Sequence, residues 1–93
     1  MPATEIKDSK VIEDLIREIE RGTLMFITFK DNDGASRSYL GVYRRYSGSA
    51  IGARIDFLRE DGEHSIAIDA LESVIIFNKG EEYKFFRDAS RQL

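Results

Sequence analysis

The spacing of hydrophobic residues changes at Gly22, which separates a helical segment from a β-rich one. Before Gly22, five aliphatic side chains recur at helical spacing: Val11, Ile12, Leu15, Ile16 and Ile19. Charged residues fill the positions between them, so the segment has one apolar and one polar face. Ser9 suits the N-cap, and Gly22 suits the position after the C-cap. The pattern therefore predicts one helix at about residues 10–21.

After Gly22 the apolar residues follow the alternation that is typical of strands. Segments rich in aromatic and β-branched residues predict five strands, at 24–30, 36–46, 50–59, 64–68 and 73–77. The separators are D-N-D-G, S-G-S, E-D-G-E and D-A-L-E, which favour tight turns. A sixth segment, E-E-Y-K-F-F, fits either a strand or a short helix, and we favour a strand. Residues 1–8 are polar, and we expect them to be a flexible N-terminus.

This order of elements predicts a mainly β protein with one N-terminal α-helix. Five to six short, bent strands joined by tight turns form a small antiparallel sheet, which usually curls into an Sm-like or SH3-like β-barrel. The side chains expected to face the barrel interior are Ile51, Ala53, Ile55, Phe57, Ile66 and Ile68. Glycines 41, 48 and 52 are positions where the sheet can bend. We expect residues 9–93 to form this single domain, with the helix covering one end or face.

Composition narrows the class of protein. A chain of 93 residues is one domain, and its 42% apolar and 33% charged residues are compatible with a folded, soluble protein. The sequence contains no cysteine, which excludes disulfides, thiolate metal sites and cysteine nucleophiles. No apolar run approaches the roughly 20 residues that span a bilayer, and the N-terminus lacks a signal-peptide pattern. We expect a cytoplasmic protein that does not contact membranes.

Charge is distributed unevenly along the chain. The net charge of -3 argues mildly against general binding of nucleic acid. Residues 36–59, however, carry five arginines and one acidic residue, whereas each flanking segment is acidic. An electropositive middle therefore lies between two acidic ends.

The electropositive middle contains Y-L-G-V-Y-R-R-Y, which starts at Tyr39. Strand alternation predicts an outward row of Tyr39, Tyr43 and Arg45, with Leu40 and Val42 pointing into the core. A surface of tyrosines beside arginines suits stacking of single-stranded nucleic acid or a protein-binding hot spot. Alternatively, the strand is simply exposed, with its arginines paired to nearby acids. The candidate binding residues are Tyr39, Tyr43, Arg44, Arg45, Tyr46 and Arg54.

Catalytic, metal and cofactor sites are not predicted. His64 is the only histidine, and its neighbours Asp61 and Glu63 lie at a hairpin tip without a recognisable nucleophile. Asp31 and Asp33 faintly resemble a calcium loop, but the ligand spacing fails and no glutamate follows at the required distance. We therefore interpret D-N-D-G as turn chemistry.

Residues 10–77 resemble the Sm-like small β-barrels. The segments F-K-D-N-D-G and I-A-I-D-A-L-E-S-V resemble the Rof-type inhibitors of Rho, and the short length is similar to the YolD-like family. Gly34, Arg37 and the segment 68–71 partly match the WYL domain. The stretch L-G-V-Y resembles the first Sm motif, although Arg44 stands where that motif has an aspartate.

The resemblance implies regulation by binding. We interpret the acidic outer face of the helix as a solvated surface; in an inhibitor of the Rof type, its Glu13, Glu18 and Glu20 would mimic nucleic acid or dock a basic partner. We hypothesise a non-enzymatic regulatory or adaptor module that acts by protein-protein binding, such as an inhibitor of a nucleic-acid-associated partner. The alternative is an Sm-like barrel that binds single-stranded RNA or DNA with the Tyr/Arg strand. A further hypothesis is homo-oligomerisation through strand edges such as E-E-Y-K-F-F.

Overall fold

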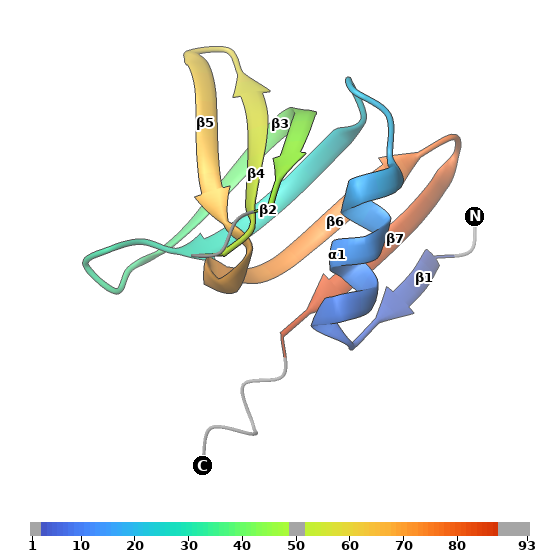
Figure 1. The fold of residues 1–93 in the computed structure, drawn as a ribbon, viewed down its shortest axis with the longest axis horizontal. Helices are drawn as coiled ribbons and strands as arrows, with labels where there is room; N and C mark the ends of the chain where they lie inside the picture. Colours follow the sequence, from blue (N-terminus) through green and yellow to red (C-terminus); the bar gives the residue numbers. More distant parts are fainter. Residues whose placement is uncertain (1–2, 49–51, 88–93) are drawn as a thin grey trace.

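The computed structural model describes residues 3–48 and 52–87, and it confirms a mainly β protein with one N-terminal helix (Figure 1). The elements in chain order are β1 (Ala3–Ile6), α1 (Ser9–Glu18), β2 (Leu24–Lys30), β3 (Ser36–Ser47), β4 (Arg54–Arg59), β5 (Gly62–Ala67), the 3-10 helix η1 (Ile68–Ala70), β6 (Leu71–Asn78) and β7 (Glu81–Phe86). The five predicted strands are therefore confirmed, with shifted ends, as are the turns at D-N-D-G and E-D-G-E, whereas residues 49–51 of the predicted S-G-S turn and third strand lie outside the described residues. The D-A-L-E segment overlaps the end of η1 and continues into β6.

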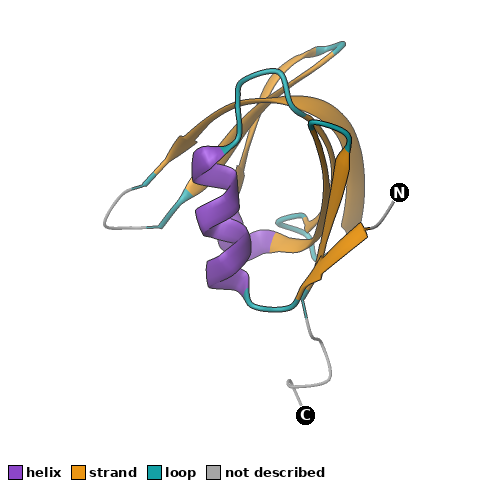
Figure 2. Ribbon diagram, turned by 90° about the vertical axis from the view of Figure 1, so that its right-hand side faces the viewer, coloured by secondary structure: helices purple, strands orange, loops and turns teal. Residues whose placement is uncertain are grey.

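All seven strands belong to one mixed sheet, in the order β1-β7-β6-β2-β3-β4-β5. The sheet curves strongly, and α1 lies on its concave side (Figure 2). The predicted barrel is not closed, because β1 and β5 are unpaired edges of the described sheet. The outer edge of β6 is already paired with β7, which in turn pairs with β1. The added strands β7 and β1 therefore occupy the edge of β6 with which β5 would pair in a closed barrel.

The N-terminal segment differs from the prediction. Residues 3–6, which were expected to be flexible, form β1 and pair in parallel with β7. The segment E-E-Y-K-F-F forms β7, which confirms the strand and excludes the short helix. Because β7 lies between β6 and β1, its two edges are both paired. It therefore offers no open edge for the oligomer contact suggested from the sequence.

Helix α1 is shorter than predicted at its C-terminal end. Its N-cap is Asp8, whose side chain accepts a hydrogen bond from the Lys10 amide at 2.9 Å. The chain becomes extended at the C-cap, Ile19, so that this side chain reaches the core. Gly22 adopts a positive φ and its amide donates to the Tyr43 carbonyl at 2.7 Å, which joins the helix to β3. No helix among residues 3–48 and 52–87 is long and apolar enough to cross a membrane.

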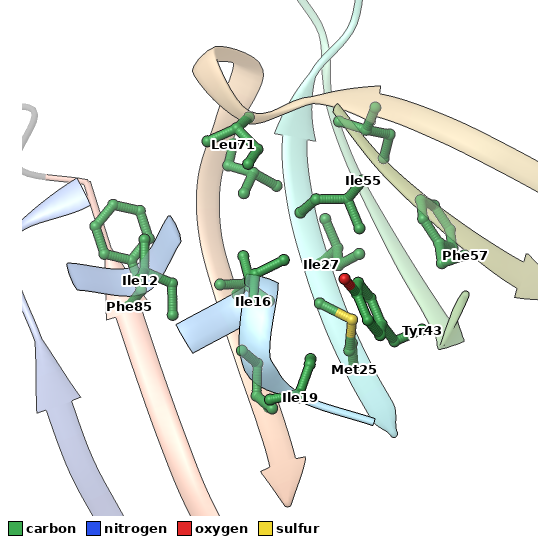
Figure 3. Packing of buried hydrophobic residues seen from close by; sticks show 14 residues of the cluster. Ile12, Ile16, Ile19, Met25, Ile27, Tyr43, Ile55, Phe57, Leu71 and Phe85 are labelled. Atoms are coloured by element: carbon green, nitrogen blue, oxygen red, sulfur yellow. The ribbon is translucent and has the colours of Figure 1, made fainter. Parts of the chain in front are cut away.

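The hydrophobic core fills the space between α1 and the concave face of the sheet (Figure 3). Of the aliphatic residues predicted on the helix face, Ile12, Ile16 and Ile19 are buried, whereas Val11 is 49% exposed. The core members from the sheet are Met25, Ile27, Tyr43, Ile55, Phe57, Ile66, Leu71, Val74, Ile76 and Phe85, joined by Ile68 from η1. The predicted inward positions on β4 and β5 are therefore confirmed, and Ala53 packs against the core. Ile51 lies outside the described residues.

Candidate functional site

The tyrosine row predicted on β3 points the other way. Met25, which is fully buried, pairs with Gly41, so Gly41 and its alternate neighbours Tyr39 and Tyr43 face the concave side. Tyr43 is only 4% exposed, and burial together with nearby Asp56 raises the pKa of its hydroxyl. The predicted outward row of tyrosines is wrong. Tyr43 lies in the core on the concave side of the sheet, and Tyr39 packs against it.

Leu40 and Val42 consequently face outward. Leu40 pairs with Phe26, and Val42 pairs with both Leu24 and Leu58. Leu40 is 55% exposed, and Val42 is half-buried. The prediction that these two aliphatic residues enter the core is therefore also wrong.

A β-bulge at Arg44 resets the alternation of β3. The pairing with β4 shifts between Tyr43 and Arg45, so Arg44 is the extra residue. Beyond the bulge, Arg45 faces outward as predicted, and its Nε lies 2.7 Å from Asp56. Tyr46 pairs with buried Ile55 and turns toward the concave side. The two adjacent arginines are both exposed, because the extra residue leaves neither of them on the concave side with Tyr43 and Tyr46.

Tyr46 links β3 to the helix. Its hydroxyl donates a hydrogen bond to the Glu13 carboxylate, and this contact raises the pKa of Tyr46 above its ordinary value. The Arg17 guanidinium lies 5.5 Å from the centre of the Tyr46 ring. Tyr46 is half-buried in these contacts and does not offer an open face for stacking.

Three arginines near the bulge have no carboxylate partner within the described part of the chain: Arg17, Arg21 and Arg44. The Arg21 Nε donates to the Arg44 carbonyl at 3.3 Å, which brings the turn between α1 and β2 beside the bulge. Arg45 does not belong to this group, because Asp56 neutralises its charge. The predicted site is split between the two faces of β3, since its tyrosines face the concave side and Arg45 faces outward.

Arg54, the last predicted site residue, contacts β5. Its Nε donates to the Ser65 hydroxyl at 2.9 Å, and its Nη2 donates to the Ser65 carbonyl at 3.1 Å. Arg54 therefore has an intramolecular role at the edge of the sheet. Its partner, Ser65, does not belong to the Tyr/Arg stretch of β3.

The surface that sequence reasoning missed is the convex side of the sheet. Five large apolar side chains, between 38% and 55% exposed, lie on β2, β3, β4 and β6: Leu24, Phe26, Leu40, Leu58 and Phe77. They are neighbours across the strands, because Leu24 pairs with Phe77 and Phe26 pairs with Leu40. Half-buried Val42 and Ile75 complete the group, which we call the convex apolar face.

A sequence signal for the convex apolar face exists in the strand pattern. The segments L-M-F-I on β2 and V-I-I-F on β6 are continuously apolar, although a strand with one solvated face needs only alternate apolar residues. Apolar residues at consecutive positions indicate strands that are covered on both sides. Only the concave side is covered within the described structure, by α1.

His64 lies in an aromatic cluster at the far end of the concave face. Its ring stacks on Phe57 with 5.6 Å between centroids, and its Nε2 lies 2.8 Å from Asp61, whose pKa this contact lowers. The Arg59 guanidinium lies 3.8 Å from the centre of the Tyr39 ring in the same cluster. No hydroxyl group hydrogen-bonds to His64 in the described residues. The geometry fits a packing role for this histidine.

The D-N-D-G segment behaves as a turn. The Gly34 amide donates to the Asp31 carbonyl at 2.9 Å, and Gly34 adopts the positive φ that such turns require. Asp33 accepts from the Ala35 amide, while Asp31 pairs with Arg37, which lowers the pKa of Asp31. Both carboxylates thus serve the reversal between β2 and β3.

No protein family, curated protein or solved structure matches this chain. The proposals about its function therefore rest on its own surfaces. Two of these stand out from the geometry, the convex apolar face and the open edge of β5.

Proposed function

We propose that this protein is a non-enzymatic regulatory or adaptor module that binds another protein on its convex apolar face. The observation that carries the proposal is the gathering of five exposed large apolar side chains on four adjacent strands. Single exposed apolar residues are ordinary, but a contiguous group of this size on a small soluble domain typically marks an interaction surface. Consecutive apolar residues on β2 and β6 support the same conclusion.

An acidic residue at one end of the convex apolar face favours a basic partner. Glu63 on β5 lies opposite Leu58 and has no ion pair among the described residues. At the other end Glu82, opposite Phe77, is neutralised by Lys84 at 3.2 Å. The complementary surface is therefore apolar with lysine or arginine at its border. Proteins that handle nucleic acid carry basic surfaces, so inhibition of such a protein is consistent with this charge pattern.

The Sm-like or SH3-like architecture remains part of the proposal. It is supported by the N-terminal position of α1, by η1 between β5 and β6, and by the return of β6 beside β2. The strand order β6-β2-β3-β4-β5 is that of a strongly bent antiparallel sheet, to which β7 and β1 are added.

A photo-crosslinking experiment tests the binding face. We expect a benzophenone side chain introduced at Leu40 to crosslink a partner protein in extracts of the native host, because Leu40 is the most exposed member of the face. The matched control is the same side chain at Val11, which is 49% exposed but lies on α1. The partner's adduct should form from position 40 and be absent from position 11.

Substitution of Phe26 provides the second half of this test. Phe26→Gln should abolish the adduct formed at position 40, because Phe26 is the cross-strand neighbour of Leu40. An adduct with twice the mass of the chain would assign the face to a second copy and contradict the proposed adaptor role. Equal crosslinking from positions 40 and 11 would contradict the choice of surface.

Binding of single-stranded nucleic acid is the alternative, and the group of Arg17, Arg21 and Arg44 favours it. Guanidinium groups without carboxylate partners attract phosphates. The tyrosines that were to stack the bases are turned inward, however, so the arginines lack an exposed aromatic platform. The alternative therefore has weaker support than protein binding.

Anisotropy of a labelled single-stranded RNA distinguishes the two functions. We expect the wild-type protein not to bind at moderate salt, and Arg44→Glu to leave the signal unchanged. Arg45→Gln is the matched control, because the charge of Arg45 is already neutralised by Asp56. Salt-sensitive binding that Arg44→Glu abolishes and Arg45→Gln retains would establish the alternative.

A further inference from the structure

Strand β5 forms an open edge of the sheet, and its hydrogen-bonding pattern defines which groups are free to pair. The Ile68 amide donates to the Ala53 carbonyl at 2.9 Å, which makes these residues a hydrogen-bonded pair. Such pairs alternate along an antiparallel ladder, so the opposed residues Ile55 and Ile66 are hydrogen-bonded as well. It follows that the backbone amide and carbonyl of Ser65 point away from β4, toward the open edge.

Arg54 occupies hydrogen-bond acceptors in the middle of this edge. Its guanidinium bonds to the Ser65 carbonyl and hydroxyl, so its side chain reaches from β4 across β5. A charged side chain on an edge hinders unwanted pairing with other chains. Arg54 is itself exposed, and an incoming strand can displace it at little cost because the guanidinium then gains a charged partner.

A cleft of about 230 Å³ lies beside the edge. Its apolar lining comes from Phe29 at the end of β2, from Ile66 and Ala67 on β5, and from Ala70 in η1. Ser65 and Arg54 border it on the β5 side. Alternate side chains of a strand added to β5 would project toward this space, because side chains of a strand point alternately to the two faces of the sheet.

The charged groups of the cleft favour an acidic ligand. Lys30 lines the cleft and has no carboxylate partner in the described residues, and Arg54 bonds only to uncharged groups. The acidic residue of the lining, Asp31, is paired with Arg37. Two cations are thus available there, and one carboxylate is already neutralised.

We propose that the edge of β5 and this cleft form a docking site for an extended acidic segment of a partner protein, which adds a strand to the sheet. The segment would pair its backbone with Glu63 and Ser65, place an apolar side chain against Phe29 and Ala70, and exchange the Arg54–Ser65 contact for an Arg54–carboxylate pair. This inference goes beyond the proposed function, because no member of the convex apolar face lines the cleft and the bordering residue Glu63 contributes only its backbone to the added strand. A second copy of the chain offers β1 and β5 as the unpaired edges of the described sheet, and each contains a single acidic residue, Glu5 or Glu63, so neither is the acidic segment that the cleft favours.

The test uses two fluorescein-labelled, end-blocked peptides of about six residues, the usual length of a strand. One alternates valine with aspartate, and the other alternates valine with lysine. We expect the wild-type protein to bind the aspartate peptide at least tenfold more tightly by fluorescence anisotropy. Arg54→Gln should remove most of this preference, whereas Arg44→Gln, which changes an exposed arginine far along the β3–β4 ladder, should retain it. Equal binding of the two peptides, or no binding of either, would overturn the proposal.

N-methylated peptides test the strand geometry without changing the protein. Methyl groups on every second amide block one edge of an extended peptide and leave the other edge free. We expect aspartate peptides methylated in the two alternate frames to differ at least tenfold in affinity. Equal affinity of the two frames would exclude strand addition. A mass that rises with concentration by light scattering and is reduced by Ser65→Pro, but not by Ser65→Ala, would give the edge to a second copy and would also overturn the proposal.

Discussion

Tyr43→Ala is expected to destabilise the fold by about 3–5 kcal/mol, the range for truncation of large buried aromatic side chains. Tyr43 is 4% exposed and lies in the core opposite Phe57, on the side of the sheet that α1 covers (Figure 3). Leu40→Ala should cost less than about 1 kcal/mol, because more than half of that side chain is exposed. The two substitutions on one strand should therefore differ several-fold in their effect.

Urea unfolding of both variants, followed by circular dichroism, measures the difference directly. The slope of the free energy of unfolding against urea should stay constant, so that a shift of the midpoint reports stability alone. Phe57→Ala and Leu58→Ala form a second pair with the same logic on β4, since Phe57 is buried and Leu58 belongs to the convex apolar face. A larger loss for Leu40→Ala than for Tyr43→Ala would mean that β3 has the opposite face toward the core.

The residues of β3 alone could not predict which of its two faces points toward the core. Both alternating sets contain apolar side chains, Tyr39 and Tyr43 in one and Leu40 and Val42 in the other. The choice depends on the partner strands, because Gly41 meets Met25 and Leu40 meets Phe26. A one-residue change of register moves every side chain to the other face, so a pattern that is apolar on both faces does not define the register.

Local signals did predict much of the fold. The turn residues Asp31 and Gly34, the helical spacing of Ile12 and Ile16, and the alternation of β4 act over a few neighbouring residues. The pairing of β1 with β7 joins residues about eighty positions apart and leaves no trace in the short polar segment before the helix. The open sheet follows from that same distant pairing. Contacts between remote segments were therefore the part that the sequence could not provide.

The exposure of the candidate site residues was predicted correctly for the two adjacent arginines and wrongly for the tyrosines. Arg44 and Arg45 are exposed because charged side chains stay in water wherever the chain allows it. The bulge that makes this possible also turns Tyr46 inward, only three residues after Tyr43. A strand without a bulge would separate these two tyrosines onto opposite faces. The paired arginines are thus a mark of the bulge more than of a binding surface.

Gly41→Ala is expected to destabilise the protein by about 1–3 kcal/mol, the usual cost of overpacking a core. A Cβ atom at Gly41 would lie 2.8 Å from the Leu58 carbonyl oxygen and 2.8 Å from a ring carbon of Phe57. The carbonyl belongs to the backbone of β4, and Phe57 is fully buried, so neither group can move without separating β3 from β4. The cost arises from this contact, because Gly41 does not have a positive φ.

Thermal unfolding of Gly41→Ala beside Gly48→Ala tests the close approach of the two strands. At Gly48 the nearest atom to an added Cβ is Cε1 of the Tyr46 ring, at 3.3 Å, and this half-buried side chain can shift. The control should therefore change stability by no more than about 0.5 kcal/mol. An unchanged midpoint for Gly41→Ala would mean that β3 and β4 are further apart than described. Since Gly41 lies between Leu40 and Val42, the same close approach sets the spacing of the convex apolar face, and Gly41→Ala should also weaken crosslinking from position 40.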